Sequence, residues 1–237
     1  MSTKRAGRGA MRTMGRKSAA RRPSRQRISP LTWVVGVAVV LVVALIVLNA
    51  SRSGRADRQG IVSSGAKSLG PADAPVVFTE FSNFACSACK QFATDAGRQI
   101  VEQYVKAGKV RFEYKHFVFG GDEAWWAAEA SECAAEQGKF WEYHDILFAR
   151  QGGVGAFSKP ALKRYASELN LDRAAFDSCL DSGRTRGRVE ADTQEAIRRG
   201  LQSTPTLFVN ERKFVGAYPF SILRDAIEQE LRAREGG

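Results

Sequence analysis

The chain has 237 residues, of which 44% are hydrophobic, and this length suits one packed domain with additional segments. Its formal net charge of +11 is concentrated at the N-terminus, because residues 1–30 contain ten Lys or Arg and no Asp or Glu. The other 207 residues carry 26 basic and 25 acidic side chains. Such a nearly neutral remainder excludes a nucleic-acid-binding domain, whose basic surface would give it a large positive charge.

Eighteen uncharged, mostly apolar residues, Leu31–Leu48, follow the basic segment and predict a transmembrane helix. Seven Lys or Arg lie in the stretch before this run and four in the stretch after it, so the positive-inside rule places the N-terminus in the cytoplasm. We therefore expect a cytoplasmic tail at residues 1–30 and a single-pass protein of the cell membrane. The alternative is a cleaved signal peptide, but Leu48-Asn49-Ala50 is a poor match to a small-x-small cleavage site.

Residues 49–70 are rich in Ser, Gly and Arg and are expected to form a flexible linker to a domain at residues 71–237. The domain opens with the apolar run Pro75–Phe81, which predicts a buried strand. Glu80 is the one charged residue in this run. A helix is then expected from about Cys86 to Ala107, before the next strand.

The motif Cys86-Ser87-Ala88-Cys89 stands at the start of this predicted helix. Two thiols three residues apart, after a buried strand, are typical of a thiol–disulfide redox centre. The helix N-terminus offers unpaired backbone N–H groups and the positive end of the helix dipole, and both stabilise a thiolate. A thiolate attacks disulfides and a thiol does not, so this placement favours disulfide exchange.

A pair of cysteines at this spacing also forms half of some zinc sites, and a purely structural bridge is another alternative. Cys133 and Cys179 are far apart in the sequence, and the only histidines, His116 and His144, match no compact spacing of metal ligands. A second pair of ligands is therefore missing. The sequence favours a redox centre, and we expect no metal ion.

A strand is expected at Val110–Tyr114, and 89 residues then separate Tyr114 from Thr204, many more than one crossover connection needs. Glycines, prolines and capping residues divide them into helices, so we expect a helical insertion over about residues 120–200. Its aromatic residues are expected mainly in the core, with a substrate groove as the alternative. The expected helices are Asp122–Gln137, Phe140–Arg150, one from Ser158, one from Leu171 to Gly183, and Thr185–Arg199.

Thr204-Pro205 precedes a short run of β-branched and aromatic residues, which predicts a strand at Thr206–Val209. Proline is tolerated at the first residue of a strand, so an ordinary edge-strand proline is one interpretation. A second strand at Lys213–Val215 and an amphipathic helix from about Pro219 to Arg234 complete the chain. Pro205 indicates a function only when it is considered together with the paired cysteines.

Together these features resemble the thioredoxin superfamily, and specifically the DsbA-like oxidoreductases that carry a helical insertion. The resemblance extends from about Pro71 to the C-terminus. It rests on Cys86–Cys89, on Thr204-Pro205 at the cis-proline position of the family, and on the stretch Ala134–Asp145. It implies an α/β, thioredoxin-like fold with an inserted α-helical subdomain, preceded here by one N-terminal transmembrane helix.

Two departures from the family pattern concern the redox poise. Phe117-Val118-Phe119 stands where many relatives have a proline after the aromatic residue, and Ser-Ala separates the cysteines where Pro-His is the best-known oxidase pair. The resemblance nevertheless implies that Cys86 attacks, that Cys89 resolves the mixed disulfide, and that Thr204 and Pro205 present backbone to the substrate peptide. It implies no metal or organic cofactor.

We expect a disulfide oxidase that acts on reduced secreted or membrane proteins, with its domain outside the cytoplasm. By resemblance, a quinone-linked membrane oxidase of the DsbB or vitamin K epoxide reductase type would reoxidise it. Three alternatives stay open: an extracytoplasmic reductase or isomerase with the same residues, a cytochrome-maturation thiol protein, and a chaperone-like binding module that does not need the cysteines.

Two further predictions concern residues outside the motif. Cys133 and Cys179, on separate predicted helices facing an oxidising compartment, are expected to form a structural disulfide, with two buried thiols as the alternative. Glu80 shares a strand face with Val76 and Phe78, and burial would raise its pKa, which suits a group that relays the proton of Cys89. An exposed glutamate at the strand end is the alternative for Glu80.

Overall fold

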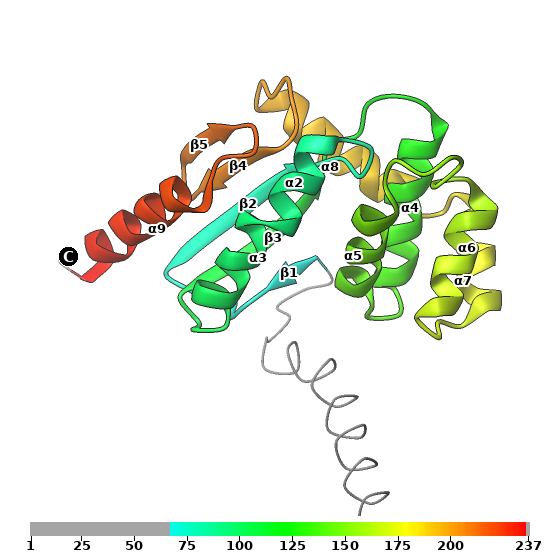
Figure 1. Cartoon of the computed structure of the whole chain (residues 1–237), viewed down its shortest axis with the longest axis horizontal. Coiled ribbons are helices and arrows are strands. Elements are labelled where there is room, and N and C mark those ends of the chain that lie inside the picture. The colour runs from blue at the N-terminus through cyan, green and yellow to red at the C-terminus, as the bar shows by residue number, and fades with distance from the viewer. Residues whose placement is uncertain (1–66, 236–237) are drawn as a thin grey trace, which may run out of the picture. The chain divides into compact units, whose positions relative to one another are not determined.

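The computed structural model describes residues 67–235, which form a mixed five-stranded sheet with helices on both faces (Figure 1). The strand order is β1-β3-β2-β4-β5, with β2 and β3 parallel and the other neighbours antiparallel. The strands are β1 (Ser68–Leu69), β2 (Val76–Ser82), β3 (Val110–His116), β4 (Thr206–Val209) and β5 (Arg212–Val215). The helices are α2 (Ser87–Thr94), α3 (Ala96–Ile100), the π-helical turn η1 (Val101–Val105), α4 (Asp122–Ala135), α5 (Phe140–Arg150), α6 (Lys159–Glu168), α7 (Arg173–Ser182), α8 (Arg186–Arg198) and α9 (Phe220–Glu235).

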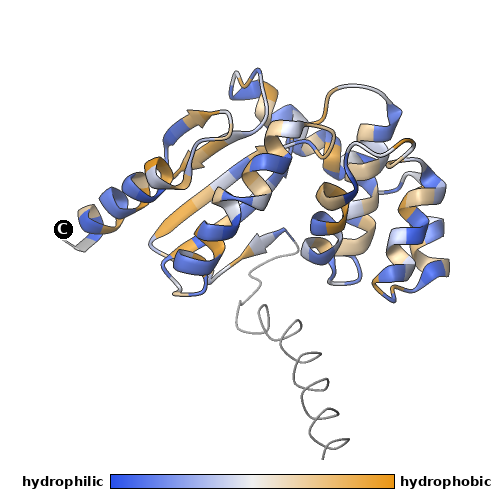
Figure 2. Cartoon of the chain, in the orientation of Figure 1, coloured by the Kyte–Doolittle hydropathy of each residue, from blue (hydrophilic) through white to orange (hydrophobic). Residues whose placement is uncertain are grey.

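The central strands bury large side chains on both faces of the sheet. On one face, Phe78 stacks on Phe92 of α2 and on Phe112 of β3, with ring centroids 5.9 and 5.1 Å apart. Helices α2, α3 and α9 close this face. On the other face, Phe81 and Phe208 pack with Ala196 of α8. Side chains that alternate along a strand therefore pack into two separate layers of the core. Figure 2 shows that much of β2 is hydrophobic.

Four helices, α4 to α7, form a bundle beside the sheet, and α8 returns from it to the sheet. The core of the bundle continues to Phe84 and Tyr114 of the sheet domain, so the two parts share buried surface. Phe140, Tyr143 and Phe148 are fully buried, as expected for core aromatics. Trp125 and Trp126 are only partly buried, and the cations of Arg186 and Lys159 lie over their rings at 3.9 and 5.7 Å.

The prediction of one continuous helix from Cys86 to Ala107 is wrong, because the structure interrupts it at Asp95. The Asp95 backbone, with φ −120° and ψ −92°, leaves the helical region. Gly97 then comes so close to the preceding turn that an added Cβ would lie 3.0 Å from the Phe92 carbonyl oxygen. The absence of a side chain at Gly97 thus permits a sharp bend within this segment.

The described domain also begins earlier than the predicted linker allows, since Ser68–Leu69 form β1 on the edge of β3. Tyr114 donates its backbone N–H to the Lys67 carbonyl at 2.9 Å. Gly70 follows with φ +91°, in a turn where a Cβ would lie 2.4 Å from the Val110 carbonyl oxygen. A two-residue strand is too short to produce a periodic signal, which explains why the sequence did not reveal it.

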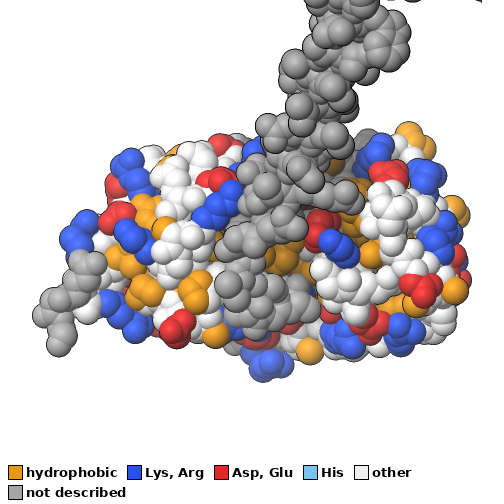
Figure 3. All heavy atoms as spheres, turned by 90° about the horizontal axis from the view of Figure 1, so that it is seen from below, with side chains coloured by type: hydrophobic (Ala, Val, Ile, Leu, Met, Phe, Trp, Pro, Cys, Tyr) orange, Lys and Arg blue, Asp and Glu red, His pale blue; other side chains and the backbone are white. Residues whose placement is uncertain are grey.

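The predicted tail at residues 1–30, the anchor Leu31–Leu48 and most of the linker lie outside the described residues. Among residues 67–235, we find no helix with the length and apolar character needed to cross a bilayer. On the face drawn in Figure 3, Lys and Arg side chains alternate with Asp and Glu, and no broad patch of one sign is visible. This mixture agrees with the nearly neutral charge of the chain after residue 30.

Candidate functional site

Cys86 is the N-cap of α2, at the point where β2 has ended and the chain turns into the helix. Asn83 builds this turn, because its carbonyl accepts the Cys86 N–H at 3.0 Å and its side-chain oxygen accepts the Ala85 N–H at 2.9 Å. Its amide also donates to the Phe119 carbonyl at 3.0 Å. Cys86 is half-buried, Cys89 is buried one turn later, and both are free thiols. The structure therefore presents one sulfur and shields the other.

The two sulfurs have opposite proton affinities. A hydrogen bond from the Cys89 thiol is the largest cause that lowers the pKa of Cys86 to about 5; partial burial opposes it, while Thr204 and backbone N–H groups of α2 support it. Burial, followed by the interactions with Cys86 and Glu80, raises the pKa of Cys89 above the range of an ordinary thiol. At neutral pH the reduced pair therefore carries its negative charge on Cys86 and its proton on Cys89.

Thr204 and Pro205 lie opposite Cys86, although 118 residues separate Thr204 from it in the sequence. The Thr204-Pro205 peptide bond is cis. The Thr204 carbonyl oxygen lies 3.3 Å from Cys86 Sγ, within hydrogen-bond reach of the thiol. The Pro205 carbonyl accepts the Gly216 N–H at 2.8 Å, which ties this loop to the end of β5. Three of the predicted site residues, Cys86, Thr204 and Pro205, thus come together at one surface.

Glu80 lies beneath this surface and is 1% exposed. Its Oε1 has no hydrogen-bond partner among the described residues. Burial is the main cause that raises the pKa of Glu80 to about 8; the Ser82 hydroxyl offsets part of this effect and the charge of Cys86 adds to it. Since Glu80 in turn raises the pKa of Cys89, the carboxyl group and the buried thiol influence one another. The exposed strand-end alternative for Glu80 is wrong.

Two side chains that carry no sequence signal also shape the site. Gln151, just after α5, donates its amide to the carbonyl oxygens of Phe84 and Cys86 at 2.5 and 2.9 Å. Tyr114 is the neighbour of Glu80 across the strand pair, and burial raises the pKa of its phenol well above the usual value. A lone Gln in a loop and a Tyr in a strand belong to no motif, so sequence reasoning missed both.

Cys133 and Cys179 are joined by a disulfide that links α4 to α7, with 5.9 Å between their Cα atoms. Both residues are 1% exposed and lie in the core of the helical bundle. Neither residue reaches the surface that holds Cys86. The structure therefore separates this disulfide from the paired thiols.

One group of potential metal ligands occurs among residues 67–235: His116, Glu132 and Asp192, whose ligand atoms lie within 4.8 Å of one another. The ammonium group of Lys67 occupies this position and binds Glu132 at 2.7 Å and Asp192. Burial would raise the pKa of Glu132, but His116 and Lys67 outweigh it and lower that pKa to about 2, whereas burial lowers the pKa of His116. The cluster thus contains its own cation.

A stabilised thiolate that faces the Thr204-Pro205 loop, with a buried thiol one turn later and a five-stranded sheet beneath, defines a thioredoxin-fold thiol–disulfide oxidoreductase. A family model described as thioredoxin matches residues 63–229. The chain therefore belongs to the thioredoxin family, which confirms the thioredoxin-like α/β fold and the oxidoreductase class.

Its relatives support the same class. The structure of oxidised BdbD from Bacillus subtilis has a TM-score of 0.66 and 28% identity, and the match covers 72% of this chain and 98% of that one. Disulfide bond formation protein D from Bacillus subtilis is 29% identical over 180 residues, which cover 70% of this chain and 77% of the relative. The matched domain is thus a protein-disulfide oxidoreductase domain of the DsbA type.

A different kind of relative is longer. The Na⁺/H⁺ antiporter NhaA 3 from Salinispora tropica is 39% identical over 161 residues, which are 67% of this chain but 24% of that protein. The chain therefore spans about a quarter of the length of this relative.

Proposed function

We propose that the protein is a disulfide oxidase that transfers its Cys86–Cys89 disulfide to reduced secreted or membrane proteins. The single observation that carries this proposal is the placement of Cys86 at the N-terminus of α2, where the Cys89 thiol, the Thr204 side chain and backbone N–H groups lower its pKa to about 5. A stabilised thiolate favours the reduced form of the pair. The disulfide form consequently becomes a good oxidant of other thiols.

The reaction begins with a thiolate of the substrate, which attacks Cys86 Sγ in the oxidised pair, because Cys86 is the more exposed of the two cysteines. The bond between the cysteines breaks and a mixed disulfide forms, and the electron pair leaves on Cys89. Glu80, with its pKa near 8, is mostly protonated at neutral pH and transfers its proton to Cys89.

A second thiolate of the substrate then attacks the substrate sulfur of the mixed disulfide. Cys86 leaves as a thiolate, and its low pKa makes it a good leaving group. The substrate has formed one disulfide, and its two electrons have reduced the pair. The backbone of Thr204 and Pro205, opposite Cys86, is where the substrate peptide would bind.

We further propose that Leu31–Leu48 anchors this domain to the outer side of the cell membrane. The apolar length of that run and the excess of Lys and Arg before it support this orientation. A quinone-linked membrane oxidase of the DsbB or vitamin K epoxide reductase type would take the electrons from the reduced pair. Labelling of intact cells with a membrane-impermeant thiol reagent should modify Cys86 after reduction; protection of Cys86 would contradict the orientation.

The test of the oxidase function is equilibration of the purified domain with a glutathione redox buffer, beside assays of reduced ribonuclease oxidation and insulin reduction. We expect oxidation of ribonuclease, which Cys86→Ala abolishes, and a reduction potential well above that of thioredoxin. A potential near that of thioredoxin, about −270 mV, would indicate a reductase and overturn the assignment. Activity that survives in Cys86→Ala would instead indicate a binding module.

A further inference from the structure

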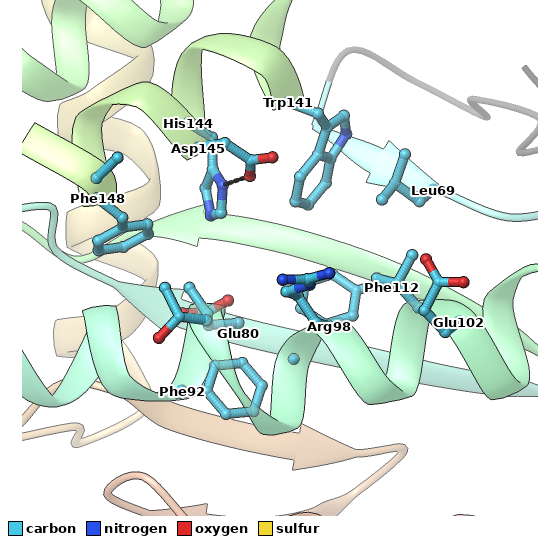
Figure 4. A pocket seen from close by; sticks show the side chains of 15 residues that line it. Leu69, Glu80, Phe92, Arg98, Glu102, Phe112, Trp141, His144, Asp145 and Phe148 are labelled. Carbon is cyan, nitrogen blue, oxygen red and sulfur yellow. Dashed lines mark hydrogen bonds and ion pairs between the residues drawn. The ribbon is translucent and has the colours of Figure 1, made fainter. Parts of the chain in front are cut away.

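A cavity of about 350 Å³ lies between α5 and the segment formed by α2 and α3 (Figure 4). It opens at exposed residues, which are Thr94, Arg98, Glu102, Asp145 and Ala149. Its inner wall is buried and consists of Glu80, Phe92, Phe112 and Phe148. Cys86, Cys89 and the Thr204-Pro205 loop do not line it. The cavity therefore leads from solvent to Glu80 by a route that avoids the surface where substrate would bind.

Three side chains that line this cavity have buried polar atoms without a hydrogen-bond partner in the described part of the chain. They are Oε1 of Glu80, Nε1 of Trp141 and Nε2 of His144. A buried polar atom without a partner is costly, so such atoms are usually paired with protein or water. A cavity of this size has room for several water molecules, and waters held at these three polar atoms would satisfy all of them.

His144 is held in place on the wall of the cavity. Its Nδ1 lies 3.0 Å from Oδ1 of the exposed Asp145, and its ring packs edge-on against Phe84 and Phe148. Figure 4 shows the ring pointing from α5 into the cavity, toward the side on which Glu80 lies. A carboxylate at Nδ1 fixes the proton there, so Nε2 remains the atom that exchanges protons with the cavity.

We propose that this cavity is the proton path of Glu80 and that His144, oriented by Asp145, passes protons between Glu80 and solvent. The inference rests on the proposed function, in which Cys89 takes a proton from Glu80. The Glu80 carboxylate regains a proton through water from Nε2 of His144, which has taken one from solvent. Each of these steps moves one proton and no electrons, because the electron pair has already gone to Cys89.

A separate path is needed because bound substrate covers the surface around Cys86 during the reaction. Cys89 is 0% exposed, and Cys86 would be covered by the substrate in the mixed disulfide. The cavity opens beside the C-terminal half of α2 and along α3, whereas Cys86 is at the N-terminal end of α2. The cavity thus gives the buried Glu80 a route to solvent that stays open while substrate occupies Cys86.

The test measures single-turnover reduction of the oxidised protein by glutathione between pH 5 and pH 9, with acid quench and alkylation of the thiols. His144→Phe keeps a ring in the aromatic cluster and removes both nitrogens, while Asp145→Asn changes an exposed carboxylate only. We expect both to slow the step by roughly tenfold or more above pH 8, where Glu80 is ionised and must first gain a proton through the path, and to leave the rate near pH 6 almost unchanged. The ionisable groups around His144 that contribute to this profile are Asp145, Glu80, Tyr114, Arg98 and Glu102.

Two comparisons separate a proton path from a general effect on the structure. In a Glu80→Gln background, His144→Phe should cause no further change in the rate, because the path then has no carboxylate to which it can deliver a proton. The matched control is Glu142→Gln, a half-exposed carboxylate on the same helix that pairs with Lys139 and does not line the cavity, and it should keep the wild-type profile.

An unchanged pH–rate profile in both His144→Phe and Asp145→Asn would overturn this inference. Additive effects of His144→Phe and Glu80→Gln would overturn it as well. The oxidase assignment fails on the reduction potential instead, so the failure of one proposal is distinguishable from the failure of the other. Asp145→Asn removes no buried group, and this variant keeps the test valid if His144→Phe does not fold.

Discussion

The two cysteine pairs of this protein have the same chemistry and opposite surroundings. Cys86 and Cys89 are three positions apart at the start of one helix, as free thiols beneath an accessible surface. Cys133 and Cys179 are 46 positions apart on two helices, joined in a disulfide, and both are 1% exposed. The position of a cysteine pair relative to a helix start and to solvent, rather than the sulfur itself, therefore decides whether the pair exchanges disulfides or only crosslinks the fold.

The largest effect is expected when Cys86 is removed from the first pair and, in a separate variant, both cysteines are removed from the second. Cys86→Ser should reduce oxidation of ribonuclease to background, because the sulfur that the substrate thiolate attacks to form the mixed disulfide is gone. The Cys133→Ala, Cys179→Ala double variant should retain most of this activity at 25 °C. Activity is measured as the initial rate of ribonuclease oxidation. Loss of activity in the folded double variant would show that the two pairs are not independent.

The disulfide pair should dominate stability instead. A crosslink that closes a loop of 46 residues stabilises a fold by about 3–4 kcal/mol in the chain-entropy model. We expect the double variant to lose about this much free energy of unfolding, measured by urea denaturation. Reduction of Cys86–Cys89 should shift the denaturation midpoint in the opposite direction, since a stabilised thiolate makes the reduced form the more stable one.

Glu80 gives the redox pair a pH dependence that the structural disulfide lacks. Its pKa is about 8 in the folded protein, against an ordinary value of 4.5, so the folded state prefers the protonated form. The resulting stabilisation is complete below the ordinary pKa and is lost as the pH rises through about 8.

We therefore expect the free energy of unfolding to fall by roughly 4 kcal/mol more between pH 5 and pH 9 in the wild type than in Glu80→Gln. Urea denaturation at each pH measures this difference. Parallel curves for the two proteins would mean that Glu80 titrates normally.

The smallest expected effect concerns the contact between the helical insertion and the turn that holds Cys86. Gln151 follows a helix of the insertion and donates to the carbonyl oxygens of Phe84 and Cys86. Gln151→Ala should lower the free energy of unfolding by about 1 kcal/mol and slow disulfide exchange by roughly twofold to threefold, because the turn before α2 loses two hydrogen bonds. Gln137→Ala, at an exposed cap of the bundle, is the matched control and should leave exchange unchanged.

The strength of the local signal determines how well the sequence predicted each part. Phe140–Arg150 and Thr206–Val209 have the predicted bounds, because glycines flank the helix and a β-branched and aromatic run marks the strand. The bend at Asp95 was missed because it depends on how closely Gly97 approaches Phe92, which is a tertiary contact.

The site was predictable where it depends on a motif and unpredictable where it depends on convergence in space. The paired thiols and Thr204-Pro205 were found because their residue types are unusual at such positions. Gln151 acts only through its proximity to the Cys86 turn, and His144 only through the cavity that it lines. No spacing in the sequence brings α5 to β2, so neither could be assigned before the fold was known.

The Lys67 cluster has a mechanical consequence. The chain enters the described domain at Lys67, whose carbonyl binds Tyr114 of β3 and whose ammonium binds Glu132 of α4 and Asp192 of α8. A pulling force applied from the N-terminal side would therefore act first on this junction, which is the set of contacts that Lys67 makes with β3, α4 and α8. Neither α2 nor the loop of Thr204 is part of this junction. If the proposed anchor pulled on the domain, Cys86 and the Thr204-Pro205 loop would therefore keep their relative positions.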